Sequence, residues 1–305
     1  MARSMTKPEA HSEGVSEAHS EGVLPLDKPA GPSSHDMVAV VRRALHTRRI
    51  GHTGTLDPFA SGLMLLCIGT ATRTAEYLSG LDKRYHARVR LGVATDTDDC
   101  TGNVIGEAEA GHVTRTQVEH ALEPMLGDVL QIPPVYSAKK RGGERAYAAA
   151  RAGRPVELDP VPVRIHELVV LSFDTPFIEL EIACGSGTYI RAIARDLGAA
   201  LGTGAHLTAL RRTAVGRHTV ERALKAEELA DPGSVQRALI PTLQALAHLP
   251  RFQLTPEQRE SIEHGRSLRC DTAPEAPVIL LADGDSLVAI AEGTGGELRP
   301  RKVFL

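Results

Sequence analysis

"GHTGTLDPFASGLMLL", residues 51–66, places one carboxylate between a loop rich in glycine and threonine and an apolar segment that should be buried. Pro58 favours extended backbone at the preceding residue, so Asp57 is not expected inside a helix. The glycines of the loop allow its backbone to approach a ligand closely. Two interpretations fit this stretch by itself: an Asx-turn that precedes Pro58, or a carboxylate that meets a ligand beside His52.

The chain on either side of this stretch interleaves strand and helix patterns. Residues 22–31, GVLPLDKPAG, are typical of a strand that ends in a turn, and KRYHARVRLG (83–92) alternates apolar and polar residues as a strand does. VPVRIHELVVLSF (161–173) and FIELEIACG (177–185) predict paired strands, and GTYIRAIARDLGAAL (187–201) predicts a helix. Because several connecting turns are too short for parallel crossovers, we expect an α+β fold with a mixed, largely antiparallel central sheet flanked by helices and loops.

Composition divides the chain into three parts. Residues 1–21 are small, polar and acidic and contain an imperfect repeat of AHSEGV, so we expect a disordered tail. Residues 22–250 are expected to form one large domain with a basic insertion at 131–155. After Pro250 the pattern changes to short strands, which predicts a small β-rich module over 251–305.

Bulk composition excludes several classes of protein. Hydrophobic residues make up 42% and charged residues 24% of the 305 residues, which is ordinary for a globular chain. No apolar run approaches 18 residues and no apolar core of a signal peptide is visible, so we expect a cytoplasmic protein with no membrane segment. The four cysteines form no CxxC pair and the histidines lack metal-ligand spacing, so we expect no bound metal.

The formal net charge is −3, yet positive residues are concentrated in three segments. Residues 131–155 carry Lys139, Lys140, Arg141, Arg145, Arg151 and Arg154, interleaved with Tyr136 and Tyr147. The other two segments lie near the start and beyond the middle of the chain, and their basic residues are Arg42, Arg43, Arg48, Arg49, Arg211, Arg212 and Arg217. A solvated charged helix explains one such segment. Three of them indicate an anionic polymer as the partner, with tyrosines that can stack on bases.

The helix predicted over 187–201 has an arginine, Arg191, close to its start. A positive charge there opposes the helix dipole. Unless this side chain is solvated, a carboxylate or a phosphate should lie near it. The preceding GSG is too short to be the GxGxxG fingerprint of dinucleotide binding.

Six motifs in order make a specific resemblance. They are LDKPAGPSSHD, GHTGTLDPFASGLM, DKRYHARVRLG, IPPVYSAKKRGGERAY, GTYIRAIARDLG and GAHLTALRRTAVG. Together they resemble the TruB family of bacterial tRNA pseudouridine-55 synthases, from about Val23 to the mid-220s. The end of the chain has a weaker likeness to a PUA-type RNA-binding module.

The resemblance implies the pseudouridine synthase fold and the conversion of a uridine in the tRNA T-loop to pseudouridine. It implies a monomer that acts on tRNA without cofactor, metal or guide RNA. Asp57 corresponds to the essential catalytic aspartate, Arg191 to the arginine that pairs with it, and Tyr85 to the tyrosine that stacks on the target base. Tyr189 lies in the same pocket motif.

Further roles follow from the same resemblance. His52 resembles the histidine that enters the RNA loop where the base has left, and Lys28 and Leu210 match positions that line the pocket. Residues 131–155 resemble a mobile thumb that closes over RNA. The resemblance therefore implies RNA contacts for the basic residues of this segment, Lys139, Lys140, Arg141 and Arg145.

Chemical reasoning is consistent with these roles and leaves alternatives open. Isomerisation breaks N1–C1′ and forms C5–C1′ of a base that must first leave the stack. An ionised Asp57 could attack C1′, attack C6 or remove a sugar proton. A protein that binds or folds tRNA, with chemistry secondary, is the main alternative function. A hydrolase built on Asp57 and His52 is weaker, because no GxSxG motif or second carboxylate accompanies them.

Overall fold

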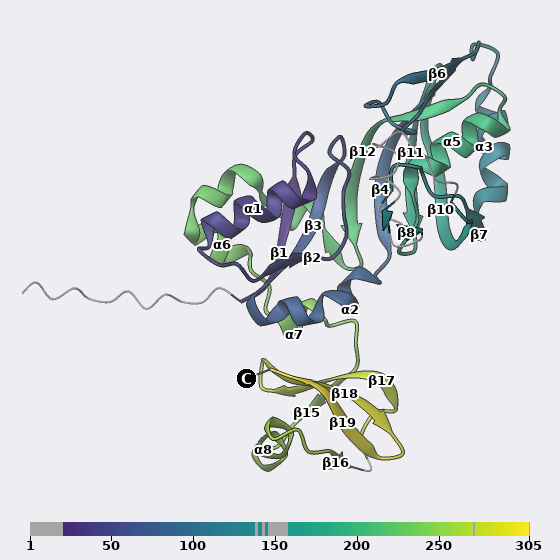
Figure 1. Ribbon diagram of the computed structural model, residues 1–305. Helices are drawn as coiled ribbons and strands as arrows, with labels where there is room; N and C mark the ends of the chain where they lie inside the picture. The colour runs from purple at the N-terminus through teal and green to yellow at the C-terminus, as the bar shows by residue number, and fades with distance from the viewer. Residues whose placement is uncertain (1–20, 138–139, 142–143, 146–157, 271, 305) are drawn as a thin grey trace, which may run out of the picture.

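The computed structural model describes residues 21–137, 140–141, 144–145, 158–270 and 272–304 (Figure 1). The expected tail, up to residue 20, and Lys139 lie outside the described residues. Lys140–Arg141 (β8) and Glu144–Arg145 (β9) are described as a two-stranded antiparallel pair, by backbone alone. The first described residue, Glu21, accepts a hydrogen bond of 2.7 Å from the Thr70 hydroxyl.

A large mixed sheet organises most of the chain. Its strands, in spatial order, are β14 (Leu224–Lys225), β1 (Gly22–Lys28), β3 (Ser61–Ile68), β12 (Ala205–Val215), β4 (Lys83–Leu91), β11 (Phe177–Cys184), β10 (Val161–Asp174) and β7 (Gly127–Gln131). Two further strands pair with β3 and β12: β2 (Ile50–His52) and β13 (His218–Thr219). Among the described strands of this sheet, β1–β14 and β3–β12 are parallel pairs and the other pairs are antiparallel. The predicted α+β class and mixed, largely antiparallel sheet are confirmed.

Strand β4 shows why the sequence pattern was readable. Tyr85, Ala87, Val89 and Leu91 are buried on one face, and the residues between them are exposed. This is the period of two expected of a strand with one face in the core. β4 lies between β12 and β11, so Tyr85 stands at the centre of the sheet.

Helices cover the core face of both halves of the sheet (Figure 1). α1 (Ser34–Ala44) begins at a capping box formed by Ser33 and Asp36 and belongs to the half that contains β1 and β3. α3 (Arg115–Leu122) and α5 (Ile190–Ala200) cover the half that contains β4, β11 and β10. The remaining helical segments are η1 (Gly69–Thr74), α2 (Ala75–Ser79), η2 (Glu123–Met125), η3 (Val220–Arg222), η4 (Ala226–Ala230), α6 (Pro232–Ala238) and α7 (Thr242–Ala245). No helix in the described ranges is long and apolar enough to cross a membrane.

A smaller sheet near the C-terminus confirms the predicted β-rich segment. Its strands, in spatial order, are β15 (Arg251–Gln253), β17 (Ala276–Asp283), β18 (Ser286–Thr294), β19 (Glu297–Val303) and β16 (Leu268–Arg269), with α8 (Pro256–Glu263) beside them. Lys302 joins it to the larger body by donating to the Arg73 carbonyl at 2.6 Å. The Arg73 guanidinium lies 4.9 Å from the Phe304 ring centroid. A separate hairpin is formed by β5 (Val93–Thr95) and β6 (Val104–Glu107), and its strand β5 contacts β12.

Candidate active site

A cavity of about 710 Å³ opens where four elements meet. These are the loop that follows β2, strands β4 and β12, and the start of α5, and residues from 97–101 and 136–137 complete the wall. Its volume is in the range of about 300–1,000 Å³ that is usual for small-molecule sites. The charged residues in its wall are Asp57, Lys83, Asp99, Arg191 and Arg212, and the aromatic ones are Phe59, Tyr85, Tyr136 and Tyr189.

Asp57 and Arg191 form a two-point ion pair in this wall. Arg191 Nε lies 2.9 Å from Asp57 Oδ2, and Nη2 donates to Oδ1 at 3.4 Å. The Asp57 side chain is 34% exposed and that of Arg191 only 6%, so the carboxylate rather than the guanidinium meets an incoming ligand. The Asp57 carbonyl accepts from the Ala60 amide, which places Asp57 at the start of a turn.

Arg191 is also the centre of a wider set of contacts. Nη1 donates to the Thr97 carbonyl at 2.9 Å and Nη2 to the Tyr136 carbonyl at 2.8 Å. Asp99 Oδ2 lies 3.7 Å from Nη1. The anionic partner expected for a positive charge near a helix start is therefore present, in the form of the Asp57 and Asp99 carboxylates. The Tyr136 contact connects Arg191 to the chain segment that leads into residues 138–157.

Burial and charge act in opposite directions on Asp57. Removal from water raises the pKa of its carboxyl group above the ordinary value, the Arg191 guanidinium lowers it, and the nearby Asp99 raises it. Arg191 therefore favours the charged carboxylate in surroundings that would otherwise favour the neutral acid.

Sequence reasoning missed Asp99. The stretch TDTDDCTGN (95–103) has the composition of a polar turn, which does not single out one of its aspartates. In the structure Asp99 is 4% exposed, and its Oδ1 accepts hydrogen bonds from the Thr97 hydroxyl and from the amide and hydroxyl of Thr101. Three aspartates within four residues, in a chain that needs an anion for Arg191, were the available signal.

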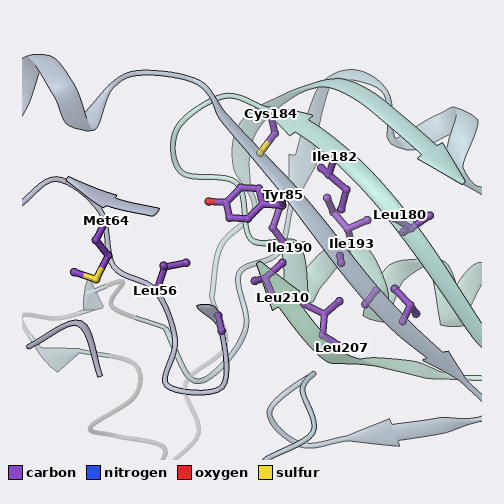
Figure 2. Close-up of a cluster of buried hydrophobic side chains, with 14 of the residues drawn as sticks. Leu56, Met64, Tyr85, Leu180, Ile182, Cys184, Ile190, Ile193, Leu207 and Leu210 are labelled. Atoms are coloured by element: carbon purple, nitrogen blue, oxygen red, sulfur yellow. The ribbon is translucent and has the colours of Figure 1, made fainter. Parts of the chain in front are cut away.

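Tyr85 provides an aromatic wall beside Leu210. Figure 2 shows its ring among Leu56, Ile190 and Leu210, reaching from β4 toward the loop that carries Asp57. Tyr85 is 8% and Leu210 7% exposed, and both line the cavity. Burial raises the pKa of the Tyr85 phenol, which keeps the hydroxyl neutral. The ring and the leucine offer an apolar surface suited to a planar base.

Lys28 lies beside the cavity and is absent from its wall. The side chain is 0% exposed, and Nζ donates to the carbonyls of Pro29, Pro32 and Pro58 at 2.8, 2.7 and 3.3 Å. Burial lowers the pKa of its ammonium to about 8, while Asp57 acts to raise it. Lys28 therefore fixes the residue after Asp57 to the turn that ends β1.

Replacing Lys28 with methionine should lower the free energy of unfolding by about 2–4 kcal/mol, because three buried carbonyls lose their donor. Urea unfolding measures the change. Lys225→Met, at an exposed position, serves as the control and should change stability by less than about 0.5 kcal/mol. Equal stabilities of the two variants would show that Lys28 does not hold these turns together.

Two other predicted residues occupy different positions relative to the cavity. His52 is half-buried at the end of β2, next to the cavity residue Thr53 and outside the lining itself. Burial, followed by the charge of Arg212, lowers the pKa of its imidazole. Tyr189 lies in the wall as the N-cap residue of α5, and its amide and carbonyl both bond the Gln131 side chain, at 2.8 and 3.1 Å.

The predicted basic segment at Arg211, Arg212 and Arg217 does not present all three charges to solvent, because Arg212 is buried. Arg212 is 2% exposed and points into the core side of the sheet, because it alternates with Arg211 along β12. Arg211 forms a bidentate pair with Asp27, at 3.1 and 2.7 Å. Arg212 is therefore unavailable to a polymer, and Arg211, with a side chain 41% exposed, has an aspartate as its partner.

Comparison with protein families and with known proteins gives consistent matches. Residues 42–190 match the N-terminal domain of TruB family pseudouridylate synthases, and residues 191–247 match the C-terminal domain of tRNA pseudouridylate synthase B. The chain is 42% identical to the tRNA pseudouridine synthase B of Azoarcus sp. (strain BH72) over 92% of its own length and 94% of the relative. It is also 42% identical to the protein of the same name from Thermobifida fusca (strain YX), over 92% and 98% of the two chains.

Solved structures show the same fold at low sequence identity. One is a chain of the "Structure of H/ACA RNP bound to a substrate RNA containing 2'-deoxyuridine", with a TM-score of 0.71, 23% identity, and coverage of 93% of this chain and 85% of that one. Another belongs to the "Crystal structure of the archaeal box H/ACA sRNP Nop10-Cbf5 complex", with a TM-score of 0.70, 23% identity, and 93% and 86% coverage. The likeness confirms the predicted fold.

Proposed function

The chain belongs to the TruB family of pseudouridine synthases, which makes it an isomerase that forms pseudouridine in tRNA, and on that premise we propose that its target is uridine 55 of the T-loop. We further propose that it flips this nucleotide into the cavity and uses Asp57 as its essential catalytic group. It acts as a monomer on tRNA alone, without a guide RNA. The observation that carries the proposal is the Asp57–Arg191 pair in the wall of a cavity that also presents Tyr85.

Base flipping is supported by the apolar surface of Tyr85 and Leu210. Extrusion of a nucleotide from a stacked loop costs a few kcal/mol. Stacking on an aromatic ring returns about 1–3 kcal/mol per base. The tyrosine lies on the central strand, where neighbouring strands on both sides fix its position, so little ordering is needed when the base arrives.

The chemistry needs an ionised carboxylate and no redox partner. The N1–C1′ bond breaks, the base turns, and C5 bonds to C1′ while its proton leaves to solvent and N1 takes one up. No atom of the nucleotide is gained or lost apart from this exchange. We assign to Asp57, whose charged form Arg191 favours, the role of nucleophile or base toward the reacting nucleoside.

We assign binding of the rest of the tRNA to positively charged segments of the chain. Arg43, Arg48 and Arg49 are exposed on α1 and the connection to β2, upstream of His52. We assign His52 to the space that the flipped base leaves in the T-loop. Residues 131–155, with Lys139, Lys140, Arg141 and Arg145, are assigned to a thumb over the RNA backbone, and residues 251–305 to a PUA-like module that binds RNA.

The test uses an unmodified tRNA transcript labelled with tritium at C5 of its uridines. The protein alone should release one equivalent of tritium per tRNA, and mass spectrometry should locate one pseudouridine at position 55. A transcript with cytidine at position 55 should release none while binding with a similar Kd. Tritium release from the cytidine transcript, or a requirement for added RNA, would overturn the assignment of the target.

A further inference from the structure

Arg212 connects the two parts of the site that act on the base. Along β12 it is the Cα partner of Gly62 in β3 and of Tyr85 in β4. β3 follows the loop that carries Asp57, and β4 carries the aromatic wall. A single side chain on this central strand therefore lies between the catalytic carboxylate's loop and the base-contacting ring.

The guanidinium of Arg212 holds this loop at both ends. Nη2 donates to the Gly54 carbonyl at 3.1 Å and Nη1 to the Thr55 carbonyl at 3.4 Å, both before Asp57. Nε donates to the Leu63 carbonyl at 2.6 Å, after Asp57. Only arginine has a planar set of donors that can reach carbonyls on both sides at once.

The fit around Arg212 is close. The Arg212 backbone touches Gly62, where a Cβ atom would lie 2.3 Å from the Arg212 carbonyl oxygen. Gly62 also has φ of +105°, a conformation that glycine adopts without strain. Glycine at position 62 therefore allows β12 to approach β3, the strand that follows the Asp57 loop.

No carboxylate of the described residues forms an ion pair with the Arg212 guanidinium. Arg191 and Arg211 each pair with an aspartate, whereas Arg212 forms no ion pair in the described part of the chain. Burial raises the pKa of the Tyr85 phenol, and the positive charge of Arg212 acts against this larger effect to lower it. Figure 2 shows the Tyr85 ring extending toward Leu56 and Met64. These two residues lie on the Asp57 loop and on β3, to which Arg212 donates its hydrogen bonds.

We propose that Arg212 is a positioning residue for the isomerisation, which fixes the loop of Asp57 to β12, directly beside Tyr85 on β4, so that carboxylate and stacking surface meet the flipped base in one fixed geometry. The inference rests on the proposed function of this site. It assigns to Arg212 a role in the chemical step rather than in tRNA binding, because its side chain is 2% exposed and donates to the carbonyls of Gly54, Thr55 and Leu63.

The test compares single-turnover tritium release with tRNA affinity in Arg212→Lys. Lysine keeps the charge but cannot reach both sides of the loop, so the rate should fall about 10–100-fold while the Kd for tRNA changes by less than about threefold. Arg212→Gln serves as a second variant that lacks the charge, and thermal unfolding establishes which variant is folded. The control is Arg84→Met, which removes a charge that pairs with Glu181 and Glu167 on the opposite face of β4.

The outcomes separate this inference from the function it rests on. No tritium release by the wild type would refute the proposed function itself. With an active wild type, a folded Arg212 variant at the wild-type single-turnover rate would overturn the positioning role. A loss confined to tRNA affinity would overturn it as well, whereas a slower chemical step at unchanged Kd, with normal Arg84→Met, supports it.

Discussion

Asp57→Asn is expected to abolish pseudouridine formation, with a fall in single-turnover rate of about 10⁴-fold or more, the scale seen when a catalytic nucleophile is removed. Asparagine keeps the shape of the side chain and can still accept from Arg191. It has no negative charge to attack the nucleoside or to take a proton. Because the change is isosteric, tRNA should bind with nearly unchanged Kd. Tritium release from C5-labelled tRNA at saturating enzyme measures the rate.

A matched control comes from a surface carboxylate. Asp128 pairs with Arg164 on the exposed edge strand β7 and has a side chain 75% exposed. Asp128→Asn removes the same charge and should retain the wild-type rate. If Asp57→Asn released tritium as fast as Asp128→Asn, the carboxylate at position 57 would have no part in the chemistry.

Arg191→Met should produce the second largest loss, about 10²–10³-fold at neutral pH, comparable to removal of a preorganised electrostatic group. The variant leaves Asp57 and Asp99 near each other without the cation between them. Burial and the neighbouring negative charge both raise the pKa of Asp57, and the opposing effect of Arg191 is gone.

The pH dependence of this variant follows from the sign of that shift. A raised pKa means that more of Asp57 is protonated at any given pH, so activity should fall further in acid and partly recover as the pH rises. The wild type should show the same acidic limb at lower pH. Arg195→Met, four residues later on α5 with a side chain 30% exposed, is the control. An Arg191→Met profile parallel to the wild type at every pH would contradict the account.

Strands with one buried face were predictable because their pattern has a period of two. β4 is the best case, since Tyr85, Ala87 and Val89 alternate with charged residues. Ser61–Ile68 was expected only to be buried. Seven of its eight positions are buried, so the sequence shows no alternation that distinguishes a strand from a helix. The short helices at Pro232–Ala238 and Thr242–Ala245 were not predicted, because a few residues give too little periodicity.

Site residues were predictable where a charged residue stood in a local sequence that does not favour it. Asp57 before a proline and Arg191 at the start of a helix were each singled out by their local sequence, and the structure shows that they pair with each other. Asp99 and Arg212 carried no such local signal. Asp99 lay in a polar turn, and Arg212 lay next to another arginine in an apparently basic run. Their burial depends on which strands become neighbours in the sheet, which is a tertiary property.

The most direct test of the central claim is a ¹³C NMR titration of the Asp57 carboxyl group in the free enzyme, compared with the acidic limb of the kcat/KM profile. The account predicts one and the same pKa in both, above the ordinary value of 3.8 and higher again in Arg191→Met. A carboxyl group that titrates at its ordinary pKa, unmoved by loss of Arg191 and unrelated to the kinetic profile, would contradict the claim that a partly buried, arginine-paired Asp57 performs the reaction.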